Sequence, residues 1–407
     1  MRIAAIISEY NPFHKGHEYQ IRMTKTEGNA THIIALMSGN FVQRGLPAII
    51  DKYRRAEMAL LGGADLVLEL PGVYALSSAE FFADGAIRIL NALNGVQLLS
   101  FGSEEGRLDG LKAIAEILAN EPAEFKELLK AELNLGHSYP KARNEALKNL
   151  LPDIDMDFIQ NPNNILGVEY LKAMIRTGSL IEPFTVKRTG KGYHDMELNE
   201  EEFASATALR KEIEDDESIH GFVPQEIYEY IEELKIQDYP FIVEEDFKDL
   251  LMYRLITEKQ SLNNIQEANE GLDNRILSRI KHLKEETVES FINEIKTKRY
   301  TRTRISRILM QYLLAYDLEP IEVLRRKTPE AIKILALNDK GKEILAALRK
   351  DKEIDLQHNY EKNLDPFQKI DQKASLIYAL KNHAYDPEWD FKGYTDYQKT
   401  DRSQKPD

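Results

Sequence analysis

The chain has 407 residues, with 54 lysines and arginines against 68 aspartates and glutamates, so its formal net charge is −14. Its length allows about two or three domains, and 30% charged residues without low-complexity tracts is typical of a folded globular protein. The absence of cysteine excludes disulfides, cysteine-ligated zinc, iron–sulfur clusters and thiol nucleophiles, so any acyl chemistry needs another means of activation.

The first 190 residues alternate short apolar runs, which predict strands, with amphipathic stretches, which predict helices. The expected strands are Arg2–Ser8, His32–Ser38, Asp65–Leu70, Gln97–Phe101 and Pro183–Lys187. The expected helices are His17–Lys25, Lys52–Leu61, Ser78–Leu93, a longer helical stretch over 109–150, and Ile165–Thr177. This alternation favours an α/β fold with a doubly wound parallel sheet, whose ligands bind beyond the carboxyl ends of the strands.

The apolar segments are too short or too interrupted to span a membrane. Met1–Ser8 contains five consecutive apolar residues, which suits a strand and not a signal peptide. Met58–Leu76 contains Asp65, Glu69 and Pro71, so it is not the apolar helix of about 20 residues that crosses a bilayer. We therefore expect a cytoplasmic protein without a membrane partner.

The pattern changes between residues 190 and 220, where a glycine-containing loop, Thr189–Tyr193, precedes an acidic run over 212–217. Beyond this point the apolar residues follow helical spacing, and no convincing series of strands is found. We expect three parts: an α/β domain over 1–210, a mostly helical domain over 211–385, and a loosely ordered tail over 386–407 that contains Trp389.

The densest chemical signal follows the first strand, in Ser8–His17 (SEYNPFHKGH). If the next helix begins near Gly16, His14 and His17 lie on the same side of its first turn, beside unpaired backbone N–H groups. Such a pair suits phosphate oxygens, and Gly16 lets a flat base or a phosphate approach the backbone. Two other interpretations stay open: the histidines only cap the helix, or they ligate zinc, although no third histidine follows nearby.

Asn11–His17 (NPFHKGH) resembles the HxGH signature of the nucleotidyltransferase superfamily. In that superfamily two histidines hold the phosphates of the nucleotide and stabilise the transition state at the α-phosphorus, while the glycine makes room for adenine. The resemblance gives these roles to His14, His17 and Gly16, and we expect Lys15 to join the two histidines as a catalytic residue.

Further segments narrow the resemblance to the family of bacterial tRNA(Met) cytidine acetate ligases, and the likeness covers nearly the whole chain. These segments are Ser38–Gly45 (SGNFVQRG), Asn161–Tyr170 (NPNNILGVEY) and the pair Lys187 and Arg188. Members of that family activate acetate with ATP to acetyl-adenylate and transfer the acetyl group to the wobble cytidine of elongator tRNA(Met), which gives N4-acetylcytidine. The resemblance implies ATP as cofactor, Mg²⁺ carried by its triphosphate and not by a protein metal site, and acetate and elongator tRNA(Met) as partners.

The resemblance also implies a set of ATP-binding residues. These are Ile7, Ser8, Glu9, Tyr10, Asn11, Pro12, Phe13, His14, Lys15, Gly16, His17, Glu18, Tyr19, Gln20, Gly102, Asn163 and Arg188. Without the family, Gly102 can also be an ordinary turn glycine, Asn163 and Asn164 can cap a helix, and Arg188 can be a surface charge.

Ser205–Arg210 (SATALR) resembles the second signature of the superfamily, whose hydroxyls and basic residue hold the departing pyrophosphate. The resemblance makes Ser205, Thr207 and Arg210 secondary candidates for the site. The segment departs from the usual form, because an alanine stands at one small polar position and the helix could begin as early as Asn199. An ordinary helix rich in alanine and serine is the alternative.

One segment of the acidic chain is basic. Residues 270–310 contain ten basic and six acidic residues, and Lys296–Arg307 (KTKRYTRTRISR) contains no acid. Its hydroxyls and Tyr300, as a stacking surface, favour RNA binding over a merely solvated charged face, and the acidic whole argues against DNA. We therefore expect the catalytic ATP site in 1–210 and tRNA binding in 211–385.

Two other functions would use the same features. An adenylyltransferase that makes a dinucleotide or a coenzyme precursor shares the HxGH chemistry but gains nothing from the basic segment. A non-catalytic RNA-binding protein could keep the nucleotide pocket as a regulatory ATP site. Omitting acetate, ATP or tRNA in turn from a modification assay distinguishes the three functions.

Overall fold

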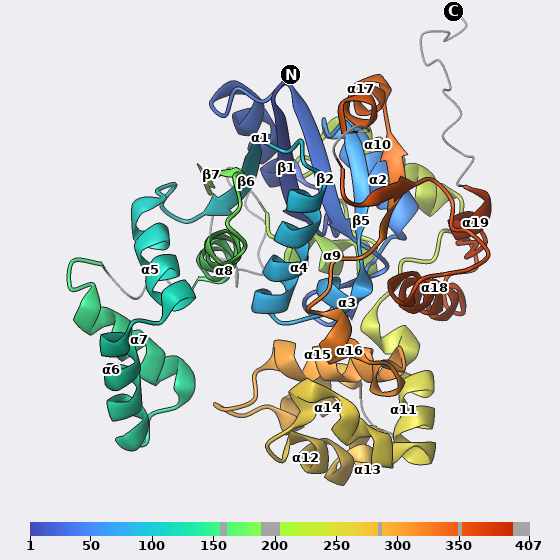
Figure 1. The fold of residues 1–407 in the computed structure, drawn as a ribbon. Coiled ribbons are helices and arrows are strands. Elements are labelled where there is room, and N and C mark those ends of the chain that lie inside the picture. Colours follow the sequence, from blue (N-terminus) through green and yellow to red (C-terminus); the bar gives the residue numbers. More distant parts are fainter. Residues whose placement is uncertain (155–160, 189–203, 284–286, 349–351, 394–407) are drawn as a thin grey trace, which may run out of the picture.

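A seven-stranded sheet forms the centre of the molecule (Figure 1). The computed structural model of the chain describes residues 1–154, 161–188, 204–283, 287–348 and 352–393. The order of the strands is β7–β6–β1–β2–β5–β8–β9. They span Ile3–Ser8 (β1), His32–Ser38 (β2), Leu66–Leu70 (β5), Leu98–Ser103 (β6), Glu182–Lys187 (β7), Ala331–Leu337 (β8) and Asp355–Gln357 (β9), while β3 (Phe41–Val42) and β4 (Leu46–Pro47) form a separate hairpin.

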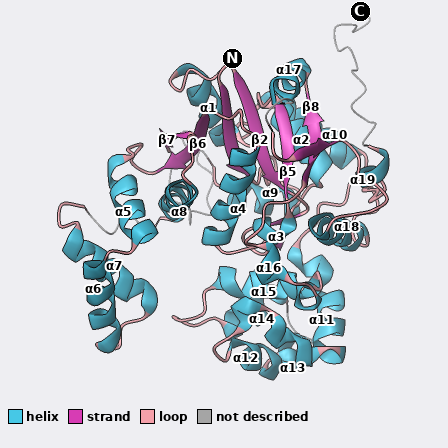
Figure 2. Ribbon diagram, in the orientation of Figure 1, coloured by secondary structure: helices cyan, strands magenta, loops and turns pink. Residues whose placement is uncertain are grey.

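The five strands expected from the sequence are all present, and they pair in parallel as β7–β6–β1–β2–β5. Figure 2 shows helices on both sides of this sheet. Every residue of β2 is buried, which explains why its sequence, HIIALMS, shows no alternation of apolar and polar residues. The predicted doubly wound α/β fold of the N-terminal part is confirmed.

The predicted helices of this part are also present. The long stretch 109–150 divides into three helices, of which α6 and α7 pack against each other and extend below α5, away from the sheet (Figure 1). The helices are α1 (Lys15–Thr26), α2 (Lys52–Leu61), α3 (Gly72–Ala75), α4 (Ala79–Ala92), α5 (Asp109–Asn120), α6 (Ala123–Asn134), α7 (Tyr139–Leu150), α8 (Pro162–Thr177) and α9 (Ala206–Glu214).

A helical lobe, residues 244–318, follows α10 (Gln225–Ile236) and lies at the end of the molecule opposite α17 in Figure 1. Buried apolar side chains such as Phe291, Ile292 and Leu309 form its interior. Its helices are α11 (Lys248–Thr257), α12 (Leu272–Ser278), α13 (Ile280–Leu283), α14 (Val288–Ile295) and α15 (Arg302–Leu313), with short 3₁₀ turns over 244–247, 259–264, 266–268 and 316–318. In the described ranges, no helix has the length and hydropathy that a bilayer crossing requires.

The chain then returns to the sheet with two strands, which the expectation of a mostly helical part after residue 210 did not include. After α16 (Ile321–Leu324), strand β8 pairs antiparallel with β5, and β9 pairs in parallel with β8. Most of β8 (AIKILAL) is buried. A short apolar run of this kind fits a buried strand and a buried helix equally well, which is why helical spacing was a poor guide.

The expected loose tail also begins too early at residue 386. After α17 (Asp339–Leu348) and α18 (Pro366–Ala379), the short helix α19 (Trp389–Lys392) packs against the α/β part. Asp390 is fully buried, accepts a hydrogen bond from the Tyr53 hydroxyl at 2.8 Å and pairs with Lys52 at 2.7 Å. Its partners lie more than 330 residues earlier, so local composition gave no sign of them. The rest of the predicted tail, 394–407, lies outside the described residues.

Candidate active site

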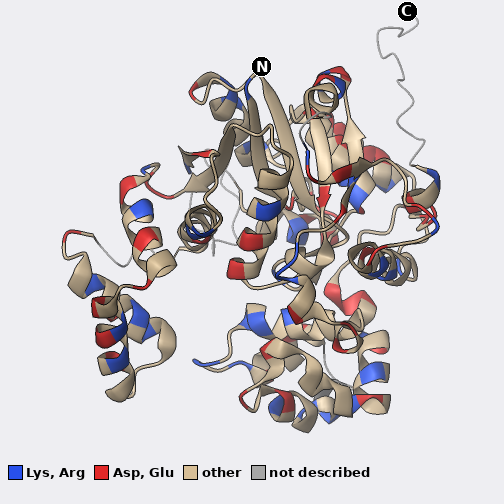
Figure 3. Cartoon of the chain, in the orientation of Figure 1, with Lys and Arg blue, Asp and Glu red and all other residues tan. Residues whose placement is uncertain are grey.

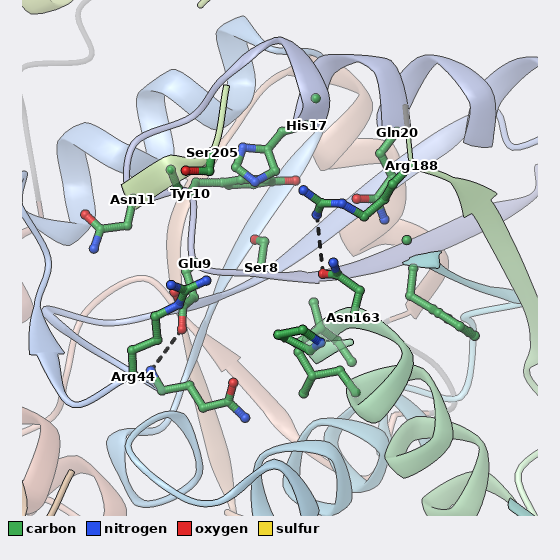
Figure 4. Close-up of a pocket in the computed structure, with 18 of the residues that line it drawn as sticks. Ser8, Glu9, Tyr10, Asn11, His17, Gln20, Arg44, Asn163, Arg188 and Ser205 are labelled. Carbon is green, nitrogen blue, oxygen red and sulfur yellow. Dashed lines mark hydrogen bonds between the residues drawn. The ribbon is translucent and has the colours of Figure 1, made fainter. Parts of the chain in front are cut away.

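A cavity of about 400 Å³ lies beyond the carboxyl ends of β1, β6 and β7 (Figure 4). This is the edge of a parallel sheet at which ligands bind. Its lining comes from the β1–α1 turn, the β3–β4 hairpin, α4, β6, α8, β7, the start of α9, and α15. The lining residues are Ile7, Ser8, Glu9, Tyr10, Asn11, His14, Gly16, His17, Tyr19, Gln20, Gln43, Arg44, Ala79, Phe82, Phe101, Gly102, Pro162, Asn163, Ile165, Leu166, Tyr170, Val186, Lys187, Arg188, Ser205, Ala206, Thr303 and Arg307.

Most of the residues expected to bind ATP therefore border one cavity, including Gly102, Asn163 and Arg188 from distant parts of the chain. Four of them do not line it: Pro12, Phe13, Lys15 and Glu18. Phe13 is fully buried, and its ring lies where a Cβ on Gly62 would be. Glu18 is exposed on α1.

The two histidines meet at the start of α1. His14 is the N-cap residue, and its Nδ1 accepts a hydrogen bond from the Gly16 N–H at 3.1 Å. The Nδ1 of His17 accepts one from the His14 N–H at 3.2 Å. The rings stack with their centroids 3.7 Å apart. Since each Nδ1 is an acceptor, each neutral ring carries its proton on Nε2, so helix capping leaves the Nε2–H groups available to a ligand.

The prediction that unpaired backbone N–H groups flank the histidines is wrong. The Lys15 N–H donates to the carbonyl oxygen of Phe222 at 3.1 Å, and the Gly16 N–H is held by His14. The donors available at this turn are therefore imidazoles and not peptide groups. The zinc interpretation also lacks further ligands, because no cluster of three metal-binding side chains occurs in the described part of the chain.

Both imidazoles are neutral near pH 7. Burial lowers the pKa of His14 to about 3, and the positive charge of Arg188 acts in the same direction. Burial is also the largest cause that lowers the pKa of His17 well below its usual value, and His14 and Arg188 act in the same direction. Each ring therefore offers an N–H donor without adding charge of its own.

Asn163 and Arg188 form another side of the cavity (Figure 4), and Gly102 also lines the cavity. Nη1 of Arg188 donates to Oδ1 of Asn163 at 3.3 Å, and Nδ2 of Asn163 donates to Glu104 at 2.8 Å. A Cβ on Gly102 would lie 3.4 Å from Cγ of Arg188, so these two residues are in contact. The alternative that Asn163 caps α8 is wrong, because the helix begins at Pro162 and Asn161 is its N-cap residue.

The secondary candidates Ser205, Thr207 and Arg210 lie near Arg44, an arginine that was not predicted to belong to the site. Nη1 of Arg44 donates to the Thr207 hydroxyl at 3.1 Å, and Nη2 of Arg210 donates to the same hydroxyl at 3.2 Å. Ser205 caps α9 by accepting from the Ala208 N–H at 3.2 Å. Burial lowers the pKa of Arg44 to about 10, against the attraction of Glu9. Of these residues, Arg44 and Ser205 line the cavity.

Several other lining residues were not predicted. The apolar ones, such as Phe82, Leu166 and Tyr170, cannot be distinguished from core residues by sequence pattern. Arg44 lies within the family segment SGNFVQRG, which was the only signal for it. Thr303 and Arg307 show that α15, from the helical lobe, forms part of the wall.

The basic segment is less available to RNA than predicted. The prediction of Tyr300 as a stacking surface is wrong, because the residue is 9% exposed and its hydroxyl donates to the Glu270 carbonyl at 2.7 Å. Arg302 pairs with Glu244 and Glu289, and Arg307 pairs with Glu267. Within Lys296–Arg307 the exposed cations are Lys296, Lys298 and Arg299, in the loop before α15, which projects from the helical lobe in Figure 3.

Comparison with known proteins shows the family to which the chain is similar. A family model described as HIGH Nucleotidyl Transferase matches residues 1–390. The chain is 41% identical over 397 residues to the tRNA(Met) cytidine acetate ligase of Clostridium novyi, covering 96% of this chain and 98% of that protein. It is 42% identical over 393 residues to the ligase of the same name from Clostridium perfringens, covering 94% and 96%.

Two solved structures are similar over almost their whole length. Thermotoga maritima TmcAL in its apo form matches with a TM-score of 0.88 and 31% identity, covering 97% of this chain and 99% of that chain. TmcAL bound with alpha-thio ATP matches with a TM-score of 0.87 and 31% identity, covering 97% and 98%. The similarity therefore includes the helical lobe as well as the sheet.

Proposed function

The chain belongs to the HIGH nucleotidyl transferase family, and from this premise we propose that it is an ATP-dependent tRNA(Met) cytidine acetate ligase. The observation that carries the proposal is the stacked pair of neutral imidazoles, His14 and His17, at the edge of a cavity that also contains Gly102, Asn163 and Arg188. The relatives of that name match nearly the whole chain, and a similar protein binds an ATP analogue. The substrates are ATP, acetate and elongator tRNA(Met), and the reaction takes place in the cytoplasm.

In the first step a carboxylate oxygen of acetate attacks the α-phosphorus of ATP. The bond between the α-phosphorus and the bridging oxygen breaks, and pyrophosphate leaves. The Nε2–H groups of His14 and His17 donate to the α-phosphate oxygens, on which negative charge increases in the transition state. Arg44 and Ser205 line the same cavity and are suited to hold the departing pyrophosphate.

Mg²⁺ would reach this site on the triphosphate. The described residues contain no cluster of three or more histidine, aspartate or glutamate side chains that could hold a metal ion. Phosphate oxygens and water are sufficient ligands for Mg²⁺, which rarely needs a cage made of protein alone. When bound, it would neutralise part of the charge on the triphosphate, beside the arginines of this chain.

In the second step the exocyclic amine of the wobble cytidine attacks the acetyl carbon of acetyl-adenylate, and AMP leaves. A cytosine amine is a weak nucleophile, so acetate must first become part of a reactive anhydride. The chain has no cysteine and so cannot use a thioester. The exposed Lys296 and Lys298 precede α15, whose Thr303 and Arg307 border the cavity, so tRNA bound by the helical lobe can present a base there.

The test is incubation of the protein with labelled acetate, ATP and total bacterial tRNA, followed by mass analysis of the nucleosides. We expect labelled N4-acetylcytidine only when all three substrates are present. A labelled adenylylated small molecule that forms without tRNA would instead identify an adenylyltransferase. Binding of tRNA and ATP without any product would identify a non-catalytic protein.

A further inference from the structure

Among the described residues that line the cavity, Glu9 is the only carboxylate. We propose that Glu9 is the general base of acetyl transfer and accepts the proton that the cytidine amine loses. This inference rests on the proposed function and assigns a residue to its second step. Glu9 also belongs to the segment Ile7–Gln20 that the resemblance expects to wrap ATP, and the inference adds a role for its side chain in the later step.

The side chain of Glu9 is held at one oxygen. Glu9 follows β1, and its backbone carbonyl accepts a hydrogen bond from Nη1 of Arg55 at 2.5 Å. Its Oε1 accepts a hydrogen bond from the Gln43 N–H at 3.0 Å (Figure 4). No described residue donates a hydrogen bond to the second oxygen, Oε2. The carboxylate also attracts the buried guanidinium groups of Arg44 and Arg210. Its second oxygen nevertheless accepts no hydrogen bond from a described residue and stays available to a substrate.

The carboxylate of Glu9 attracts Arg44 and Arg210, but it does not favour the anionic substrates of the first step. ATP, acetate and pyrophosphate are all anions, and a negative side chain beside them opposes their binding. The other charged groups of the lining are cations, from Arg44, Lys187, Arg188 and Arg307. The neutral cytidine amine is the one reacting group that gains from a carboxylate, because it must lose a proton when it is acylated.

The two histidines and two of the tyrosines of the lining are unsuited to accept that proton. In His14 and His17 each Nδ1 already accepts a backbone hydrogen bond, and each Nε2 carries the proton of the neutral ring. Burial also lowers the pKa of both histidines. Burial raises the pKa of Tyr10 and Tyr170, which keeps both as neutral phenols.

The position of Glu9 also fits the second substrate. Through Gln43 it is attached to the β3–β4 hairpin, which packs against α15 in the helical lobe. In Figure 4, Glu9 and Arg44 lie on the side of the cavity away from Asn163 and Arg188. Once pyrophosphate has left its place beside Arg44, a base that arrives from the helical lobe would meet Glu9 there, while the adenosine would occupy the side near Asn163 and Arg188.

The proposed step is balanced without a further reactant. The N4 nitrogen forms a bond to the acetyl carbon, and the bond from that carbon to the phosphate oxygen of AMP breaks. AMP leaves as an anion, and the N4 proton passes to the Glu9 carboxylate, which later releases it to water. General base catalysis of this kind contributes about 10²–10⁴-fold to a rate.

Glu9→Gln tests the proposal, because the amide oxygen can still accept from the Gln43 N–H but the side chain cannot take a proton. The first step is measured by acetate-dependent exchange of pyrophosphate into ATP, and by trapping acetyl-adenylate with hydroxylamine. The second is measured by single-turnover transfer from preformed acetyl-adenylate to tRNA. We expect transfer to fall at least about 100-fold, and at least about tenfold further than the first step falls.

Two further variants sharpen the experiment. Glu9→Asp keeps the carboxylate on a shorter side chain and should recover part of the transfer rate lost in Glu9→Gln. Glu116→Gln removes an exposed carboxylate from α5 and should behave like the wild type in both steps. A merely structural role for Glu9 would not separate the two steps in this way.

The outcomes distinguish this inference from the proposed function. If the wild type forms no N4-acetylcytidine, the proposed function fails. If the wild type forms it and Glu9→Gln transfers acetyl at the same rate, Glu9 is not the base. If Glu9→Gln impairs both steps equally, Glu9 serves ATP binding or the orientation of Arg44, and the inference is also overturned.

Discussion

A Cβ atom on Gly45 would lie 2.2 Å from the backbone nitrogen of Arg307. Gly45 belongs to the hairpin that carries Gln43 and Arg44, and Arg307 belongs to α15. The hairpin and the helix therefore meet backbone against backbone, with no room for a side chain between them. This contact joins the helical lobe to the edge of the sheet at which the cavity lies.

Gly45→Ala should loosen this contact. The added methyl group overlaps backbone atoms, which cannot move aside as a side chain can, and overpacking of this kind costs about 1–3 kcal/mol. Gly136→Ala is a matched control, since Gly136 also has a positive φ (83° against 77°) but nothing within 4 Å of the place that a Cβ would take. Chemical denaturation measures both free energies of unfolding. Equal losses of unfolding free energy in the two variants would show that the close approach of Gly45 to α15 does not contribute to stability.

His14→Ala and His17→Ala should each lower acetyl-adenylate formation by about 10²–10³-fold, because each removes a donor to the transition state. Binding of tRNA should be nearly unchanged, since both side chains lie in the cavity and not on the exposed loop before α15. Pyrophosphate exchange and filter binding measure the two effects. Full activity in either variant would remove that histidine from the mechanism.

His14→Asn should flatten the pH dependence of stability. The folded chain holds the pKa of His14 at about 3, whereas an unfolded histidine titrates near about 6.5. Between these values the unfolded chain binds a proton that the folded chain does not, so wild-type stability falls as pH decreases below about 6.5, by up to about 1.4 kcal/mol per pH unit from this residue. Asparagine can still cap α1 but does not titrate. Denaturation between about pH 7 and pH 5 compares the two slopes, and identical slopes contradict the prediction.

Asp390→Ala should be strongly destabilising. It removes one of the two carboxylates that pair with the buried Lys52 and an acceptor of the hydrogen bond from the Tyr53 hydroxyl. Breaking a buried ion pair in this way costs about 3–5 kcal/mol. Lys392→Ala, in the same short helix, breaks only the exposed pair with Glu388 and should cost about 0.5 kcal/mol or less. Thermal denaturation of both variants tests the difference.

Lys296→Ala combined with Lys298→Ala should weaken tRNA binding and reduce its dependence on salt. Both side chains are exposed, and each lost phosphate contact should lower the slope of log K against log salt concentration by about 1. Lys342→Ala, on α17 at the other end of the molecule in Figure 1, is the control. Unchanged affinity in the double variant would place tRNA elsewhere.

The same experiment with Arg302→Glu would be misleading. That substitution sets a new carboxylate against Glu244 and Glu289, which now pair with Arg302. A loss of tRNA binding in this variant would then reflect damage to the lobe and not a lost phosphate contact. The two lysines avoid this ambiguity because no described carboxylate pairs with either of them.

The sequence predicted the elements whose local pattern is strong. β1, β2 and β5 are apolar runs, and the HxGH motif is a local arrangement, so both were read from neighbouring residues. β8 and Asp390 were missed because their partners, β5 and Lys52, lie hundreds of residues away. The ion pairs of the basic segment were also missed, because two of its partners, Glu244 and Glu267, lie before the segment in the chain.

The site was predicted in part for a similar reason. Gly102, Asn163 and Arg188 came from family resemblance, and their meeting at one cavity follows from the parallel sheet, which brings the ends of β6 and β7 together. The presence of Arg44, Thr303 and Arg307 in the cavity wall depends on how the hairpin packs against α15. The spacing of apolar residues in the sequence does not encode that packing. The direction of the histidine Nδ1 atoms is likewise a tertiary detail.

The antiparallel pairing of β8 with β5 means that the ATP-binding half is not a contiguous stretch of the chain. A fragment that stops before β8 would leave Leu66–Leu68 as an open, apolar strand edge, which is a template for aggregation. It would also leave Lys52 and Glu69 without Asp390. Transplanting or expressing the nucleotide-binding half alone therefore calls for a linker that replaces the helical lobe and keeps residues 331–393, and not for a simple truncation.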